Sequence, residues 1–177
     1  EIQHGHLEQV GYDTYCNLLD EVVREIQGEK VEPEIDVQID LDATCYIPDT
    51  YISDSSQKIE IYQDIALCKN EEDIQNVIDE MIDRFGNMPK EIENLIEIAR
   101  IKILCKKLNI SKVQGRRSFV LFMFEPGELS IDINELVKKY KNRIKFTQGI
   151  KPQITLALNN LSEIKMLKEV KEFLSCC

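Results

Sequence analysis

Residues 70–110 read NEEDIQNVIDEMIDRFGNMPKEIENLIEIARIKILCKKLNI and carry the strongest structural signal in the chain. The first half of this stretch repeats apolar residues at i, i+3, i+4 and i+7, the spacing of a helix with one buried face. These positions are Ile74, Val77, Ile78, Met81, Ile82 and Phe85. Asn70 stands where an N-cap is needed, and Gly86 stands where the helix must end. The segment therefore predicts an amphipathic helix whose opposite face is acidic.

A second helix follows the break at residues 86–90. Pro89 is tolerated at a helix start because its missing N–H has no partner to lose there. Beyond it, apolar residues cover nearly the whole circumference: Ile92, Leu95, Ile96, Ile98, Ala99, Ile101, Ile103, Leu104 and Leu108. A helix that is apolar all round must be buried. Residues 70–110 thus predict a helical hairpin in which one arm is buried and the other displays carboxylates.

The elements on either side of the hairpin predict an α+β fold. Residues 36–43 alternate between apolar and acidic side chains, as an edge strand does, and Asp54 is placed to cap a helix. Further strands are expected at residues 112–114, 118–124, 144–146 and 153–158, and further helices at 131–140 and 161–174. Ile133, Leu136 and Val137 should point inward. Residues 118–124 are apolar on both faces, which predicts a central strand. We expect the hairpin and the other helices to pack on a small mixed or antiparallel sheet.

A linker divides the predicted domain from an N-terminal segment. Residues 7–27 carry an apolar stripe of helical spacing that Gly28 ends. Residues 29–35 contain Pro33 and four charged side chains, a composition typical of a linker. We therefore expect an appended helix within residues 1–28, a linker over 29–35 and a domain over 36–177.

The composition limits which class of protein this chain can belong to. The chain has 177 residues, of which 43% are hydrophobic, enough for one ordinary core. It contains no apolar run of the roughly 18 residues that a membrane span needs and no segment typical of a signal or transit peptide. The six cysteines lack metal-type pair spacing, so we expect reduced packing residues rather than disulfides. A cytoplasmic protein without membrane contact is the expectation.

Charge divides the chain more sharply than the net value of −10 suggests. From Glu1 to Ala99 there are 25 acids against 6 bases, whereas from Arg100 to Lys151 there are 13 bases against 4 acids. The acidic part should be attracted to a basic protein surface. The basic part could contact phosphate groups, or it could simply balance the acidic part.

Reaction chemistry is hard to find in the sequence. The seven glycines are scattered and no Gly-Lys-Ser or Gly-Lys-Thr occurs, so nothing predicts ATP hydrolysis or a bound cofactor. His4 and His6 could hold a metal, but a loose polar terminus explains them better. Carboxylate pairs such as Asp79 with Asp83 would need a cleft with unequal pKa values, and no cleft is indicated. We therefore predict neither an enzyme nor a metal or cofactor site.

Three blocks of residues resemble bacterial transcription-repair coupling factors. The first, Gln3–His6 with Val10–Tyr15, is similar to the segment that leaves the translocase motor of that family. The second comprises Tyr46–Asp49 with Tyr51, Ile52 and Asp54, followed by Ile59–Tyr62, and is similar to the hallmark of the C-terminal domain. The third is Ile82–Pro89, continuing through Asn94-Leu95 and Ile98–Arg100 to Leu108–Ile110. Together the blocks cover residues 3–110.

The resemblance implies a regulatory role in DNA repair. In that family the C-terminal domain docks on a UvrB-like module of the same chain, masks the UvrA-binding surface and restrains an ATP-driven DNA translocase until RNA polymerase is engaged. The interface acids of the family lie on the helix before the Arg-Phe-Gly turn. They correspond here to Glu80 and Asp83, with Asp79 and Asp73 as neighbours. Carboxylates three residues apart share one side of a helix and can bind arginines.

Other interpretations of the same residues stay open. Glu80 and Asp83 could be ordinary solvated residues. A DNA-contacting accessory domain could use the basic region at residues 100–151, through Arg116, Arg117, Lys138, Lys139, Lys141 and Arg143, although the net negative charge opposes DNA binding. A carboxylate enzyme would require a cleft that holds an acid of raised pKa.

Overall fold

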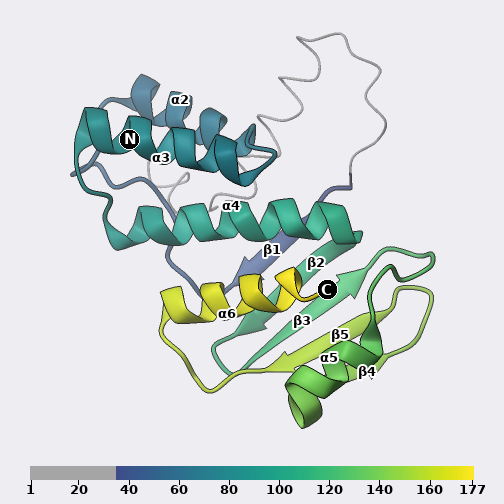
Figure 1. Cartoon of the computed structure of the whole chain (residues 1–177). Coiled ribbons are helices and arrows are strands. Elements are labelled where there is room, and N and C mark those ends of the chain that lie inside the picture. Colours follow the sequence, from purple (N-terminus) through teal and green to yellow (C-terminus); the bar gives the residue numbers. More distant parts are fainter. Residues whose placement is uncertain (1–34) are drawn as a thin grey trace, which may run out of the picture. The chain divides into compact units, whose positions relative to one another are not determined.

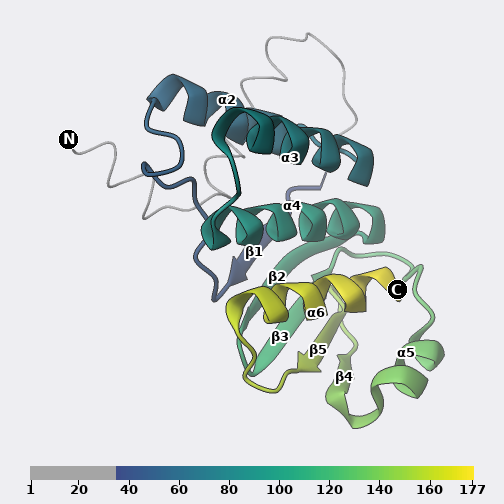
Figure 2. The ribbon, with the colours of Figure 1, turned by 60° about the vertical axis from the view of Figure 1, so that its left-hand side comes forward.

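The computed structural model describes residues 35–177, and Figures 1 and 2 show it in two views. The predicted helix at residues 7–27 and the linker up to residue 34 lie outside the described residues. The described chain divides into two compact units: unit 1 holds Thr44–Arg100, and unit 2 holds Ile35–Ala43 together with Ile101–Cys177. The division falls inside one continuous helix, α4. No described helix has the length and apolar character that crossing a membrane would require.

Unit 1 consists of helices whose ends were predicted from the sequence. They are α2 (Ser55–Ala66), α3 (Glu71–Phe85) and the first part of α4 (Lys90–Leu108). The Asp54 carboxylate accepts from the Gln57 N–H at 2.9 Å, and Asn70 caps α3 in the same way. Gly86 ends α3 with a φ of +87°, a conformation that favours glycine. The predicted caps and the predicted break are confirmed.

A pinned loop at residues 44–54 closes unit 1. Ile47 and Ile52 are buried, and the Ile47 N–H donates to the Tyr62 hydroxyl oxygen at 2.8 Å. The Tyr51 hydroxyl donates to the Gly86 carbonyl at 2.7 Å and lies 3.2 Å from the Met81 carbonyl. Carbonyl groups at a helix C-terminus lack partners within the helix. The loop therefore satisfies the end of α3, and it brings two of the sequence blocks described above into contact.

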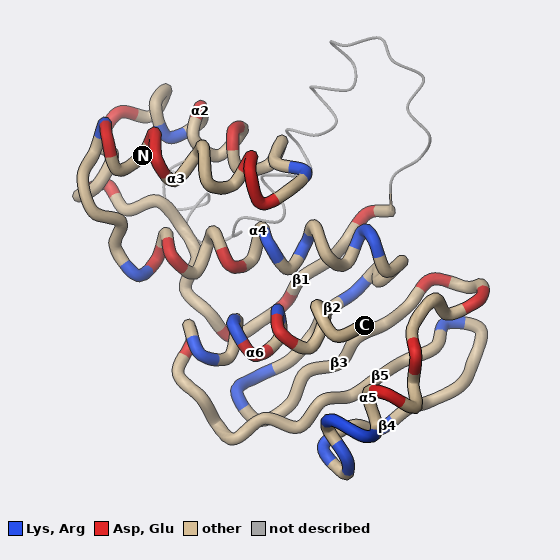
Figure 3. The backbone as a smooth tube through the Cα atoms, viewed as in Figure 1, with Lys and Arg blue, Asp and Glu red and all other residues tan. Residues whose placement is uncertain are grey.

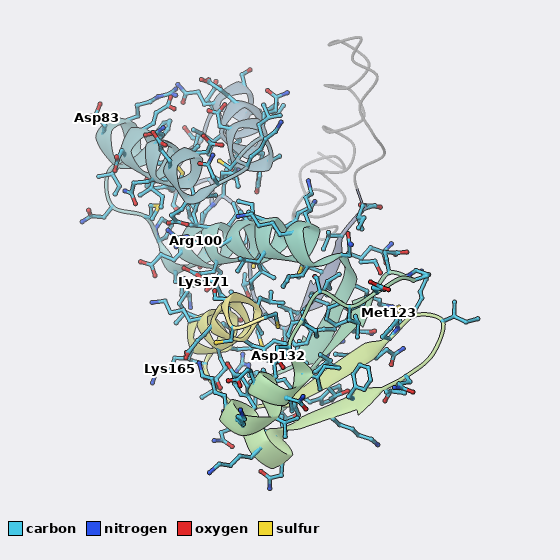
Figure 4. The ribbon with its side chains drawn as sticks, turned by 45° about the vertical axis from the view of Figure 1, so that its right-hand side comes forward. Asp83, Arg100, Met123, Asp132, Lys165 and Lys171 are labelled. Atoms are coloured by element: carbon cyan, nitrogen blue, oxygen red, sulfur yellow. The ribbon has the colours of Figure 1, made fainter. Side chains whose placement is uncertain are left out.

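An ionic cluster joins the N-terminus of α3 to α4. The Arg100 guanidinium (Figure 4) donates to Glu71, with the shortest contact at 2.6 Å, and to Glu97 at 2.7 Å. The Glu97 side chain is only 6% exposed. Buried carboxylates are stable when a hydrogen-bonded cation neutralises them, so the bond from Arg100 helps to stabilise Glu97 within this helix pair.

Unit 2 is built on a five-stranded mixed sheet of order β1-β2-β3-β5-β4. The strands are β1 (Gln38–Leu41), β2 (Ile110–Arg116), β3 (Phe119–Phe124), β4 (Ile144–Thr147) and β5 (Gln153–Ala157). Strand β1 pairs parallel to β2, and the other pairings are antiparallel. The α+β class, the edge position of β1 and the central position of β3 are confirmed.

Two helices cover one face of this sheet. They are α5 (Ile133–Tyr140) and α6 (Glu163–Ser175). The Phe122 ring on β3 stacks on Phe173 of α6 with centroids 4.7 Å apart, and Tyr140 of α5 meets the same ring edge-on at 5.3 Å. The sheet residues beneath these helices alternate along their strands and are buried, as Val113, Val120, Phe122, Ile154 and Leu156 are.

Two expectations from the sequence were wrong in unit 2. The turn expected at residues 115–117 lies one to two residues later, because Gly115 and Arg116 belong to β2. A Cβ on Gly115 would lie 2.3 Å from the Phe119 carbonyl oxygen, so close strand approach rather than a turn requires glycine there. Val137, predicted to point inward, is 48% exposed because the short α5 buries only Leu136 and Tyr140.

Candidate docking surface

The exposed face of α3 carries the acids that the sequence singled out. Its apolar face, formed by Ile74, Val77, Ile78 and Met81, is buried, which leaves the intervening carboxylates in solvent. Asp83 lies near the C-terminal end of α3 and points outward (Figure 4). Among residues 35–177 it makes no hydrogen bond or ion pair. Its charge is therefore available to a partner without breaking any contact within this part of the chain.

Glu80 is exposed but has a partner on its own helix. Its carboxylate lies 2.9 Å from the Arg84 guanidinium, and its side chain is 43% exposed. Arg84 also lies 3.5 Å from Glu60 of α2 and stacks over the Phe85 ring at 4.9 Å. The hydrogen bond that Arg84 donates to the Glu80 carboxylate raises the pKa of Arg84. Any external cation that binds Glu80 must compete with Arg84.

Helix α2 adds two carboxylates that the sequence analysis did not connect with α3. Oxygens of Glu60, Asp64 and Glu80 lie within 4.8 Å of one another. Burial raises the pKa of Asp64, the charges of Glu80 and Glu60 raise it further, and Arg84 lowers it. The i, i+4 spacing of Glu60 and Asp64 indicates a shared helix side, but only the packing of α2 on α3 brings that side to Glu80. These three groups could offer oxygen ligands to a cation, and Arg84 already supplies positive charge there.

Asp79 and Asp73 are engaged locally. The Asp79 carboxylate accepts from the Gln75 side-chain amide at 2.8 Å on the exposed side of α3. The Asp73 carboxylate accepts from the Lys69 N–H at 2.9 Å, while the Asp73 N–H donates to Asn70. This arrangement is similar to a capping box, except that the Asp73 carboxylate accepts from the N–H of the residue before the N-cap. Asp73 thus stabilises the start of α3, which gives it a structural role beside any contact with a partner.

The basic residues of the alternative DNA-contacting surface are mostly paired with acids of unit 2. Lys138 lies 2.8 Å from Glu135, and Lys139 lies 3.3 Å from Glu172. The remaining pairs are Arg116 with Asp40, Arg117 with Asp42 and Glu163, and Arg143 with Glu169. A phosphate group would have to displace these carboxylates. The structure therefore gives this surface less available positive charge than the sequence suggested.

The charges of the two units differ in sign. The described residues of unit 1 contain 13 acids and 5 bases, whereas those of unit 2 contain 10 acids and 15 bases. Figure 3 shows the acids along α2 and α3 in red and the bases around α5 in blue. An acidic surface on a rigid helical pair can bind arginine or lysine side chains of another protein through charge-assisted hydrogen bonds. That is the chemistry that unit 1 offers.

Comparison with known proteins places these features in a family. Residues 41–136, more than half of the chain, match the TRCF domain. The chain is 34% identical over 178 residues to the transcription-repair-coupling factor of Rickettsia prowazekii (strain Madrid E), covering 98% of this chain and 16% of that protein. It is 32% identical over 186 residues to the factor of the same name from Bacillus subtilis (strain 168), covering 96% and 16%. The chain thus spans about one sixth of the length of these relatives.

A solved structure has the same fold. The crystal structure of the C-terminal domain of a transcription-repair coupling factor superposes with a TM-score of 0.70 at 24% sequence identity. The superposition covers 80% of this chain and 92% of the other. The α+β arrangement described above is therefore the arrangement of that C-terminal domain.

Proposed function

The chain belongs to the TRCF domain family, and we propose that it is a regulatory C-terminal domain that holds a transcription-repair coupling factor in an inactive state. In this proposal residues 36–177 form the regulatory domain, and residues 1–28 are the end of the preceding translocase module. The domain has no catalytic step of its own, in keeping with the absence of a phosphate-binding glycine loop from the sequence.

The observation that carries the proposal is the placement of Asp83 and Glu80 on the exposed side of α3. The two residues are three apart, so their carboxylates share one side of the helix. A guanidinium group of the UvrB-like module would bind Asp83 directly and would take Glu80 from Arg84. Because Arg84 still has Glu60 within 3.5 Å, it keeps a carboxylate partner after this exchange. After docking, Arg84 would therefore still be paired with the carboxylate of Glu60.

Ion pairs of this kind are weak enough for an inhibitory interaction that has to be reversible. A partly exposed ion pair contributes about 0 to 1 kcal/mol. A competing partner must supply roughly 5.5 kcal/mol to shift an equilibrium from 99:1 closed to 1:99 closed. Because the ion pairs are weak and screened, the binding free energy of one competing protein interface is enough to open them. We propose that docking masks the UvrA-binding surface of the UvrB-like module, and that engagement of RNA polymerase by the parent protein releases the domain.

Substitution of both acids in the parent protein tests the proposal. We expect Glu80→Ala with Asp83→Ala to increase capture of UvrA and to raise ATP turnover, because the domain no longer holds the inactive state. The measurements are a pull-down with UvrA and a steady-state ATPase assay, each alongside a thermal melt that verifies folding.

A matched control uses two exposed acids outside the proposed contact. Glu72→Ala with Glu93→Ala removes the same charge from unit 1 and should leave UvrA capture and ATP turnover unchanged. Unchanged UvrA capture by the Glu80 and Asp83 variant, under conditions where the isolated UvrB-like module captures UvrA well, would overturn the assignment.

A further inference from the structure

The second face of the unit 2 sheet has the composition of a binding surface. The strand register puts one set of side chains on this face, opposite to the buried set: Gln38, Asp40, Lys112, Gln114, Arg116, Phe119, Leu121, Met123, Lys145, Thr147, Gln153, Thr155 and Ala157. Phe119 is 48% exposed, and Leu121 and Met123 are partly exposed. In Figure 4 Met123 lies on the side of the sheet opposite α6. Antiparallel sheets commonly leave one face in solvent, but the side chains on that face are then polar. An apolar stripe on the solvent face of β3 therefore needs an explanation.

The face has an apolar centre and a cationic margin. Phe119, Leu121 and Met123 follow one another along β3, the middle strand of the sheet. Arg116 stands directly across from Phe119, and Lys112 stands across from Met123. Lys145 lies on the other side, in the edge strand β4. Asp40, 3.6 Å from Arg116, is the acid among the side chains that the register assigns to this face.

We propose that this face binds an acidic amphipathic helix of a partner protein. The three apolar residues of β3 are spaced by about 6.8 Å, so the stripe is about 14 Å long. A helix rises about 5.4 Å per turn, so two to three turns of an apolar helix stripe match its length. Acids beside that stripe would meet Lys112 and Arg116 on one side and Lys145 on the other. This surface is separate from α3, and the inference does not depend on the docking function proposed above.

The composition of the face favours this occupant over two others. Single-stranded nucleic acid is bound by several aromatic rings on which bases stack, and the apolar stripe has one ring, Phe119. A second copy of this chain offers α3 as its acidic helix, but the apolar face of α3 is already buried within unit 1. An acidic helix from another protein supplies both the apolar stripe and the charge that this face lacks.

Binding of a defined peptide to the 177-residue chain tests the inference. The probe is a fluorescent, end-blocked peptide of Leu, Ala and Glu, with leucines at helical i, i+3, i+4 and i+7 spacing and glutamates on both flanks. We expect saturable binding in fluorescence anisotropy. Phe119→Ser and Lys145→Glu should each weaken it about fivefold or more, since they remove a central apolar contact and an opposing charge.

Two matched variants outside the face serve as controls. Val137→Ser removes an apolar residue that is also 48% exposed, and Lys165→Glu reverses an exposed charge on α6. Both should bind the peptide as the unmodified chain does. The inference is overturned if the peptide does not bind or if the control variants lose equal affinity. It is also overturned if a dT oligonucleotide binds with the same dependence on Phe119, or if self-association of the chain blocks the face.

Discussion

Arg100 shows how much a single side chain can stabilise in this fold. It is the guanidinium that neutralises Glu97, whose side chain is 6% exposed, while it also binds Glu71 at the start of α3. We expect Arg100→Met to lower the free energy of unfolding by about 3 kcal/mol, because the buried Glu97 carboxylate then loses the guanidinium that binds it. Urea unfolding followed by circular dichroism measures this. The surface pair of Lys138 and Glu135 is the control, since Lys138→Met should cost less than about 1 kcal/mol. Equal costs for the two variants would contradict the role given to Arg100.

Asp64 links stability to pH. Burial, Glu80 and Glu60 raise its pKa above the ordinary 3.8, so the ionised form is less favourable in the folded chain than in the unfolded chain. The folded state therefore loses stability as the pH rises from below 3.8 through the raised pKa. Asp64→Asn removes that loss. Its free energy of unfolding should exceed that of the unmodified chain near neutral pH, by less than about 1 kcal/mol because the cluster is partly solvated. The difference should vanish below about pH 3.5. A less stable Asn variant at neutral pH would refute this explanation.

Local sequence rules predicted the helix-capping residues, but they missed contacts that depend on how two helices pack. The caps at Asp54 and Asn70 and the helix end at Gly86 follow from contacts within a few residues, so they could be predicted. Glu60 and Asp64 were missed as neighbours of Glu80 because that contact depends on how α2 packs on α3, which no local pattern specifies. The ion pair of Arg84 with Glu80 follows i, i+4 spacing and was available from the sequence.

At the scale of elements, the β2–β3 hairpin depends on Gly115. A Cβ there would lie 2.3 Å from the Phe119 carbonyl oxygen and 2.7 Å from the Val120 Cα, both backbone atoms. We expect Gly115→Ala to destabilise the chain by about 2 kcal/mol or more, because the strands would have to separate. Gly149→Ala is the matched control, since its nearest contact is an ordinary 3.8 Å. Thermal unfolding of both variants measures the difference, and an equally mild effect at the two positions would contradict the close approach.

The loop at residues 44–54 stabilises the end of α3 through Tyr51. Removing the hydroxyl in Tyr51→Phe leaves the Gly86 carbonyl without that donor, and we expect a loss of about 1 kcal/mol in the free energy of unfolding. Tyr46→Phe in the same loop provides the comparison, because within residues 35–177 the Tyr46 hydroxyl makes no hydrogen bond. If both substitutions have the same effect in urea unfolding, the contact with α3 is not what holds the loop.

The elements themselves could mostly be predicted, whereas their pairing could not. Every α-helix and strand among residues 35–177 coincides with a predicted segment to within a few residues, because hydrophobic period and caps are local signals. The short 3-10 helix at Lys141–Arg143 was not predicted. The parallel pairing of β1 with β2 joins residues that are some 70 positions apart, and no turn chemistry encodes it. The open face of β3 was missed because the six consecutive apolar residues Phe119–Phe124 are compatible with burial on both faces.

Across the described chain, acidic and basic side chains are unevenly distributed. The sequence predicted an acidic and a basic part, and the described residues carry them in different units, with 13 acids against 5 bases in unit 1. The sequence did not predict that five of the six basic residues of the alternative DNA-contacting surface pair with acids. Apart from Lys138 with Glu135, these pairs join segments that are distant in the chain. This pairing is why we propose the acidic surface of α3, rather than the basic region, as the docking surface.

The most direct measurement is binding of the 177-residue chain to the separate UvrB-like module, by titration calorimetry at low and high salt. We expect binding that weakens with salt, because partly exposed ion pairs are screened. Glu80→Ala with Asp83→Ala should weaken it roughly tenfold and flatten the salt dependence, whereas Glu72→Ala with Glu93→Ala should leave it nearly unchanged. If the Glu80 and Asp83 variant binds as tightly as the unmodified chain at both salt concentrations, the acidic surface of α3 is not the docking surface.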